Sequence, residues 1–124
     1  MNALLLQETK GSPKVEFYPS GDLLLHGRSI PLDPVNFYEP LIRWAEMCAC
    51  ENIVFTIRLY YINTSSSKQL FSILKILKEK PNVKQFKVNW YYDDDDDDAY
   101  DIGREMEFLI NMSFNFQEYA EILE

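Results

Sequence analysis

The chain has 124 residues, of which 47% are hydrophobic and 15% aromatic, which is enough for one domain with a real core and excludes a disordered chain. Its formal net charge is −8, from 20 acidic against 12 basic residues, and the run Asp93–Asp98 supplies most of that imbalance. Without a basic tract or a basic-aromatic stripe, nucleic-acid binding is disfavoured. No apolar stretch approaches the length that spans a bilayer, so membrane insertion is not expected.

We expect a single domain over residues 1–124, with residues 1–10 as a flexible N-terminus. The first residues lack the basic region, the apolar region and the cleavage site of a signal peptide. Cys48 and Cys50 follow a helical pattern in which residues two apart face different sides, so a disulfide between them is implausible. These features predict a reduced, cytoplasmic protein.

The first part of the chain predicts a β-hairpin followed by a helix. Residues 14–18 and 23–27 have strand character on either side of the turn cluster Pro19-Ser20-Gly21-Asp22. Asp33 is a good N-cap, and the apolar spacing predicts a helix from Pro34 to about Ala49. The residues expected to face the core are Phe37, Leu41, Trp44, Ala45 and Cys48.

The rest of the chain alternates strands and helices. We predict strands over residues 52–62 and 84–92, and helices over residues 66–80 and 99–112. The first of these strands is apolar on both faces, which predicts cover on at least part of each side. Residues 114–116 predict a short edge strand, with a turn of helix after it. The order predicts an α/β fold: a mixed β-sheet of about four to five strands with an N-terminal β-hairpin and three main helices.

In the predicted helix over residues 99–112, the residues expected to face inward are Ile102, Met106, Leu109 and Ile110. For the second helix they are Leu70, Ile73, Leu74 and Leu77.

The catalytic inventory is sparse. His26 is the only histidine and lies in a predicted strand. No glycine-rich phosphate loop follows a strand, and no serine has the context of a nucleophile elbow. The sequence therefore predicts neither an enzymatic activity nor a cofactor.

The most informative segment is Asn63–Lys68, with sequence Asn-Thr-Ser-Ser-Ser-Lys, at a predicted strand-to-helix junction. The start of a helix exposes unpaired N–H groups and carries positive partial charge, so it accepts side-chain oxygens or a phosphate. One interpretation is a well-capped helix, and the other is a Ser/Thr switch presented to a modifying enzyme.

The aspartate run allows two interpretations. Asp93–Asp98 is a solvated loop whose last member caps the third helix, or it is a site for a small ligand or a divalent cation. The EF-hand pattern is missing, so no metal ligands are assigned. Since parallel strands end at one sheet edge, we expect this loop near the loop after Ile62. Around the two loops, the candidates for partner docking are Tyr60, Tyr91, Tyr92 and Tyr100, with Asp93 and Asp94.

Several segments together resemble a known family. They are Ser12–Phe17, Gly27–Pro31, Phe37–Leu41, Tyr61–Lys68 and Asn89–Tyr92 with the acids that follow. In this order, over nearly the whole chain, they resemble the SiaC-like regulatory phosphoproteins.

This resemblance implies a STAS-like fold, similar to anti-sigma-factor antagonists, and a non-enzymatic partner-switching role. A dedicated kinase would phosphorylate a hydroxyl in the Asn-Thr-Ser-Ser segment, and a PP2C-type phosphatase would reverse it. The unmodified form would bind an effector, which in the family's best-known systems is a diguanylate cyclase linked to biofilm behaviour. By motif position the acceptor is Thr64, with Ser65 as the alternative. Asn63, Ser66 and Lys68 would support the phosphate.

Overall fold

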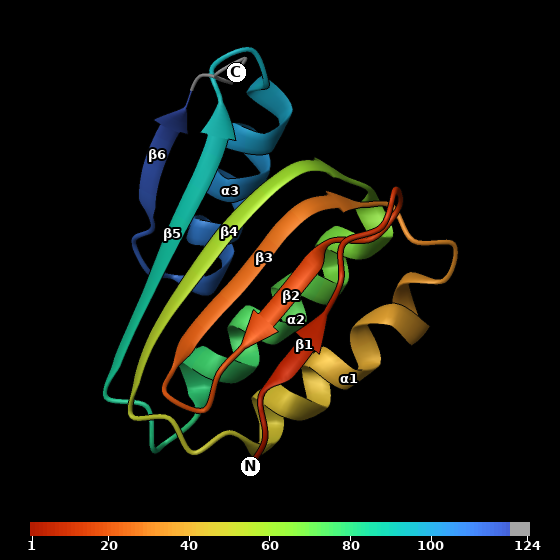
Figure 1. The fold of residues 1–124 in the computed structure, drawn as a ribbon. Helices are drawn as coiled ribbons and strands as arrows, with labels where there is room; N and C mark the ends of the chain where they lie inside the picture. The colour runs from red at the N-terminus through yellow and green to blue at the C-terminus, as the bar shows by residue number, and fades with distance from the viewer. Residues whose placement is uncertain (120–124) are drawn as a thin grey trace.

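The computed structural model describes residues 1–119 of the chain. These residues form six strands and three helices, shown in Figure 1. In chain order they are β1 (Leu4–Leu6), β2 (Lys14–Phe17), β3 (Asp22–Ser29), α1 (Pro34–Met47), β4 (Asn52–Ile62), α2 (Thr64–Glu79), β5 (Gln85–Asp93), α3 (Asp97–Ile110) and β6 (Asn115–Tyr119). None of the described helices is long and apolar enough to cross a membrane.

The six strands make one mixed sheet in which spatial order equals chain order. Strands β1, β2 and β3 pair antiparallel, whereas β3 through β6 pair parallel. The predicted α/β class, the hairpin and the three helices are therefore confirmed. The strand count is six rather than four to five. Residues 1–10 were expected to be flexible, but Leu4–Leu6 pairs with Val15–Phe17 and adds a strand. The predicted C-terminal turn of helix lies outside the described residues.

All three helices cover the same face of the sheet (Figure 1). The prediction that β4 is covered on at least part of each side was wrong, because the three described helices all lie on one face. Ile53, Phe55 and Ile57 are buried under the helices, while Val54 on the other face is 37% exposed and Thr56 is only half-buried. Apolar and β-branched residues on that open face reflect strand propensity and not burial under a second layer.

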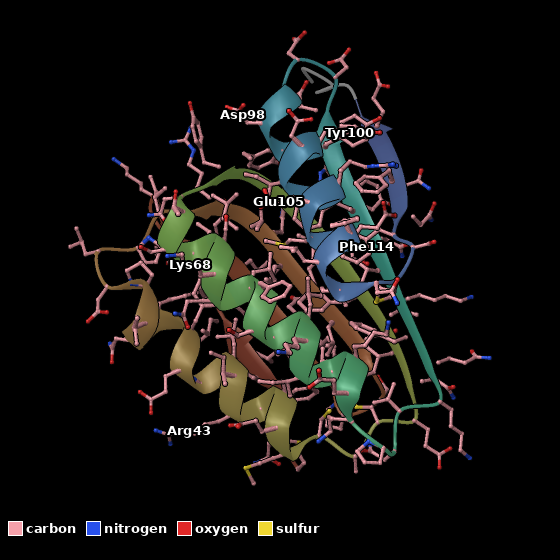
Figure 2. All side chains as sticks on the ribbon, turned by 180° about the vertical axis from the view of Figure 1, so that it is seen from behind. Arg43, Lys68, Asp98, Tyr100, Glu105 and Phe114 are labelled. Carbon is pink, nitrogen blue, oxygen red and sulfur yellow. The ribbon has the colours of Figure 1, made fainter. Side chains whose placement is uncertain are left out.

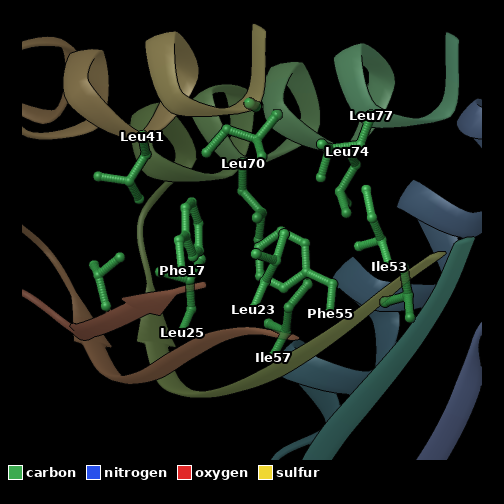
Figure 3. Close-up of a cluster of buried hydrophobic side chains, with 14 of the residues drawn as sticks. Phe17, Leu23, Leu25, Leu41, Ile53, Phe55, Ile57, Leu70, Leu74 and Leu77 are labelled. Atoms are coloured by element: carbon green, nitrogen blue, oxygen red, sulfur yellow. The ribbon is translucent and has the colours of Figure 1, made fainter. Parts of the chain in front are cut away.

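The core lies between the sheet and helices α1 and α2 (Figure 3). The predicted stripe of α2 is confirmed, because Leu70, Ile73, Leu74 and Leu77 are fully buried. In α3, Met106 and Ile110 are buried as predicted, but Ile102 is half-buried and Leu109 is 56% exposed. Both residues line the groove between α3 and α2, where Ile102 packs against the edge of the core and Leu109 remains largely exposed.

Helix α3 approaches the sheet closely at Gly103. A Cβ at this position would lie 2.7 Å from the indole Nε1 of Trp90 and 2.8 Å from the ring of Phe116. The same indole Nε1 donates a hydrogen bond to the carbonyl oxygen of Ala99, at 3.0 Å. The absence of a side chain at Gly103 thus sets the distance between α3 and β5.

Candidate functional site at the start of helix α2

Strand β4 passes into α2 through a single capping residue. Asn63 has extended backbone angles, and its Oδ1 accepts a hydrogen bond from the Ser66 amide at 2.8 Å. Its carbonyl oxygen accepts the first helical bond, from the Ser67 amide at 2.9 Å. The helix begins at Thr64, two residues earlier than predicted, because the asparagine and not a serine satisfies the free amides. The helix-cap interpretation of this segment is confirmed.

The four hydroxyls of the segment differ in accessibility. Thr64 and Ser65 are exposed, Ser67 is half-buried, and Ser66 is fully buried. The Oγ of Ser66 has no hydrogen-bond partner within residues 1–119. Only Thr64 and Ser65 therefore present their side chains freely to an enzyme, which excludes Ser66 as an acceptor in the folded state.

The capping residue is itself anchored from the core. The Asn63 amide donates to the carbonyl oxygen of Ser29, at 3.2 Å, and the Ser29 Oγ lies 2.6 Å from the Tyr38 hydroxyl of α1. Both hydroxyls are fully buried. Burial raises the pKa of Tyr38 to about 12, so its hydroxyl stays neutral and able to donate.

Sequence reasoning named Phe37, which is half-buried and packs against the core, but missed its fully buried neighbour Tyr38. The available signal was spacing, since Tyr38 lies three residues before Leu41 and seven before Ala45, on the buried stripe of α1.

A groove of about 510 Å³ runs between α2 and α3 beside this site. Thr64, Ser67 and Lys68 line it on one side, and Glu105 lines it on the other. Figure 2 shows Lys68 and Glu105 on the two helices that border it. Its apolar lining consists of Ile62, Phe71, Ile102, Met106 and Leu109. Residues 64–67 include no acid, and the exposed Lys68 lies one turn after Thr64, so the first turn of α2 itself favours an anion.

The loop formed by the aspartate run is shorter than predicted, because the run begins in β5 and ends in α3. Asp93 ends β5, and Asp96 rather than the last aspartate caps α3, accepting a hydrogen bond from the Ala99 amide at 3.0 Å. The Asp95 amide donates to Asp93 at 3.0 Å and lowers the pKa of that carboxyl, whereas the contact with Asp93 raises the pKa of Asp94. Oxygens of Asp93, Asp94 and Asp95 lie within 4.8 Å of one another.

The two candidate loops follow parallel strands, as predicted, but the strand ends diverge (Figure 1). Pairing between β4 and β5 ends at Arg58 and Tyr91. Beyond it lies a cavity of about 460 Å³, with Tyr60, Tyr61 and Ile62 on one wall and Asp93, Asp95, Asp96 and Asp98 on the other. Thr64 lines the adjoining groove instead, and the two hollows share Ile62 and Ile102.

The tyrosines expected to dock a partner fall on both faces of the sheet. Tyr60 contacts His26 on the uncovered face, with the hydroxyl 2.9 Å from Nε2, and burial lowers the pKa of that histidine. Tyr91 points to the same uncovered face. On the helix-covered face, the ring of Tyr92 packs against that of Tyr100 at 4.9 Å between centroids. The four rings therefore do not form one continuous patch.

A mixed sheet with helices on one face, and a hydroxyl-rich helix start at the carboxyl edge of its parallel strands, defines a small α/β domain with an anion-favouring surface site. The comparison with family models identifies its kind. The chain belongs to the SiaC family of regulatory phosphoproteins, whose model matches residues 6–119.

The chain is also similar to individual proteins of Pseudomonas aeruginosa. The structure of SiaC from that organism is 25% identical, with a TM-score of 0.82 over 96% of this chain and 100% of that chain. A chain from the crystal structure of the diguanylate cyclase SiaD in complex with its activator SiaC has the same fold, with a TM-score of 0.83 at 24% identity, over 94% of this chain and 99% of that chain. An uncharacterized protein of strain UCBPP-PA14 is 25% identical over 98% of this chain and 100% of its own length.

Proposed function

We propose that this protein is a non-enzymatic switch that is reversibly phosphorylated on Thr64 and binds an effector when unmodified. The observation that carries the proposal is the exposed Thr64 hydroxyl at the first position of a capped helix, next to a fully buried Ser66. Membership in a family of regulatory phosphoproteins supports it. Ser65 is the alternative acceptor, because it is the other exposed hydroxyl.

The start of α2 suits a phosphate physically. Free amides and the helix dipole stabilise an anion there by about 0.3–1 kcal/mol, and Lys68 one turn on provides a cation. Phosphorylation of Thr64 therefore leaves the fold intact. It adds about 1.5–2 negative charges and three acceptor oxygens at the mouth of the groove between α2 and α3. A partner that docks on the largely apolar groove would have to bury that charge, which weakens its binding.

The partners that this role requires are a dedicated kinase, a PP2C-type phosphatase and an effector, all in the cytoplasm. We propose a diguanylate cyclase as effector, supported by the likeness to SiaC, the activator of the cyclase SiaD. Docking would centre on the groove beside Thr64. From the earlier candidates, Tyr60 and Asp93 line the adjoining cavity and Asp94 follows Asp93 in the chain, while Tyr91 and Tyr92 directly precede Asp93 in β5.

The test is phosphorylation by the cognate kinase with ATP, read by intact mass and peptide mapping. We expect one phosphate, on Thr64, and no modification of the T64A variant. S65A is the matched control because it removes the neighbouring exposed hydroxyl, and it should be modified at the wild-type rate. Modification of T64A at Ser65 would disprove the assignment of the acceptor. Loss of effector binding on phosphorylation, measured by calorimetry, tests the switch itself.

A second candidate function is binding of a divalent cation by the aspartate run. The observation in its favour is the convergence of carboxylate oxygens from Asp93, Asp94 and Asp95 within 4.8 Å. Titration calorimetry with millimolar Ca²⁺ and Mg²⁺ tests it, using D94N as the variant that should lose the heat. Absence of heat with the wild-type protein would eliminate this function.

A further inference from the structure

Three of the segments that carry the family resemblance are joined by one chain of hydrogen bonds, which ends at the first turn of α2. They contribute Ser29 at the end of β3, Tyr38 in α1 and Asn63 before α2. The chain runs from the Tyr38 hydroxyl to the Ser29 side chain, from the Ser29 carbonyl to the Asn63 amide, and from the Asn63 side chain to the Ser66 amide. The proposed acceptor Thr64 lies within its last link.

The Ser29–Tyr38 pair fixes the backbone of Ser29, whose carbonyl oxygen accepts the hydrogen bond from the capping residue Asn63. Ser29 is the last residue of β3, in register with Ile62, so its bond with Asn63 is the last one before the helix begins. Both hydroxyls of the pair are fully buried, so neither can exchange its partner for solvent. Removing one hydroxyl leaves the other buried and unpaired, which favours a shift of the Ser29 backbone.

We propose that Tyr38 is a positioning residue for the phosphorylation site: through Ser29 and Asn63 it fixes the first turn of α2 and hence the direction of the Thr64 hydroxyl. This inference rests on the proposed role of Thr64 as acceptor. A tyrosine that only filled the core would be replaced by phenylalanine without effect on that turn, because the ring is retained. The hydroxyl is therefore the part of Tyr38 to be tested.

The first measurement is amide hydrogen exchange by NMR on the whole chain, which needs no kinase. In Y38F and in S29A we expect the Ser66 and Ser67 amides to exchange about tenfold faster than in the wild type. The double variant S29A/Y38F leaves no hydroxyl unpaired but also lacks the hydrogen bond, so its Ser66 and Ser67 amides should exchange as fast as in the single variants. A return of the double variant to the wild-type rate would overturn the proposal, because the single variants would then only report an unpaired buried hydroxyl. I73V changes a buried core residue further along α2 and is the control for a general loss of stability. In I73V the Ser66 and Ser67 amides should exchange no faster than the change in global stability predicts. Wild-type exchange in Y38F overturns the proposal.

The second measurement is the phosphorylation rate with the cognate kinase. We expect kcat/KM for Y38F to fall about fivefold, with a larger share of the phosphate on Ser65, and S29A/Y38F to behave like Y38F because it lacks the same hydrogen bond. An unchanged or faster rate in Y38F, despite faster exchange, overturns the positioning role. If the wild-type protein takes no phosphate on Thr64, the proposed function fails instead, and the exchange data alone decide whether Tyr38 holds the first turn.

Discussion

Replacement of Gly103 by alanine tests whether close packing fixes α3 against the sheet. The new Cβ would lie 2.7 Å from Trp90 and 2.8 Å from Phe116, well inside normal contact distance. Overpacking of this kind costs about 1–3 kcal/mol, and displacement of the indole from Ala99 costs about 0.5–1.5 kcal/mol more. Alanine is the better helix former by about 1 kcal/mol. The net expectation is a loss of about 2 kcal/mol in the free energy of unfolding.

The assay is urea denaturation followed by Trp fluorescence and circular dichroism, with a thermal melt expected to fall by roughly 8 °C. Gly11 provides the matched control, because a Cβ there would lie 3.4 Å from the Ile30 carbonyl oxygen, an ordinary contact. G11A should therefore stay within about 0.5 kcal/mol of the wild type. A G103A protein as stable as the wild type would refute the reasoning, since helix propensity would then outweigh the contacts with Trp90.

Three other outcomes follow from the described contacts. N63A should lose about 1 kcal/mol of stability, measured in urea, while N63D keeps an acceptor oxygen and most of that stability. The pKa of Tyr38 is about 12 in the folded protein against about 10 when unfolded, so its ionisation should contribute a decline of about 2–3 kcal/mol in stability as pH rises from 10 to 12. Y38F should lack this contribution and show a smaller decline in alkaline melts. G21A should be the most damaging glycine change by thermal melting, because Gly21 has φ of +103° and a Cβ there would lie 1.9 Å from the Asn52 carbonyl oxygen.

Much of the fold could be predicted because its longer elements have strong periodic patterns. The buried stripe of α2 and the alternation of strands and helices predicted the parallel half of the sheet. Leu4–Leu6 could not be predicted, since three residues carry no pattern and form a strand only by pairing with β2. Leu109 was misjudged because periodicity gives the spacing of a helix face and not the presence of a neighbour to cover it.

The start of α2 was predictable in place but not in detail. Asparagine, threonine and serine before an apolar stripe indicate a helix start, and Asn63 provides it. The burial of Ser66 depends on how α2 is rotated against the core, which the segment alone does not determine. The link from Tyr38 to Asn63 joins residues 25 positions apart through Ser29, and such a tertiary contact leaves no local pattern.

The match between spatial and chain order in the sheet has a consequence for folding. Each strand pairs only with its neighbours in sequence, so the sheet can grow by one strand or one strand–helix unit at a time as the chain emerges. The unit of α3 and β6 is added last and has a neighbour on one side only. We expect it to open first in native-state exchange, before β3 and β4. Helix α3, which forms the wall of the groove opposite Thr64, would then change its position for different partners at the lowest cost in free energy.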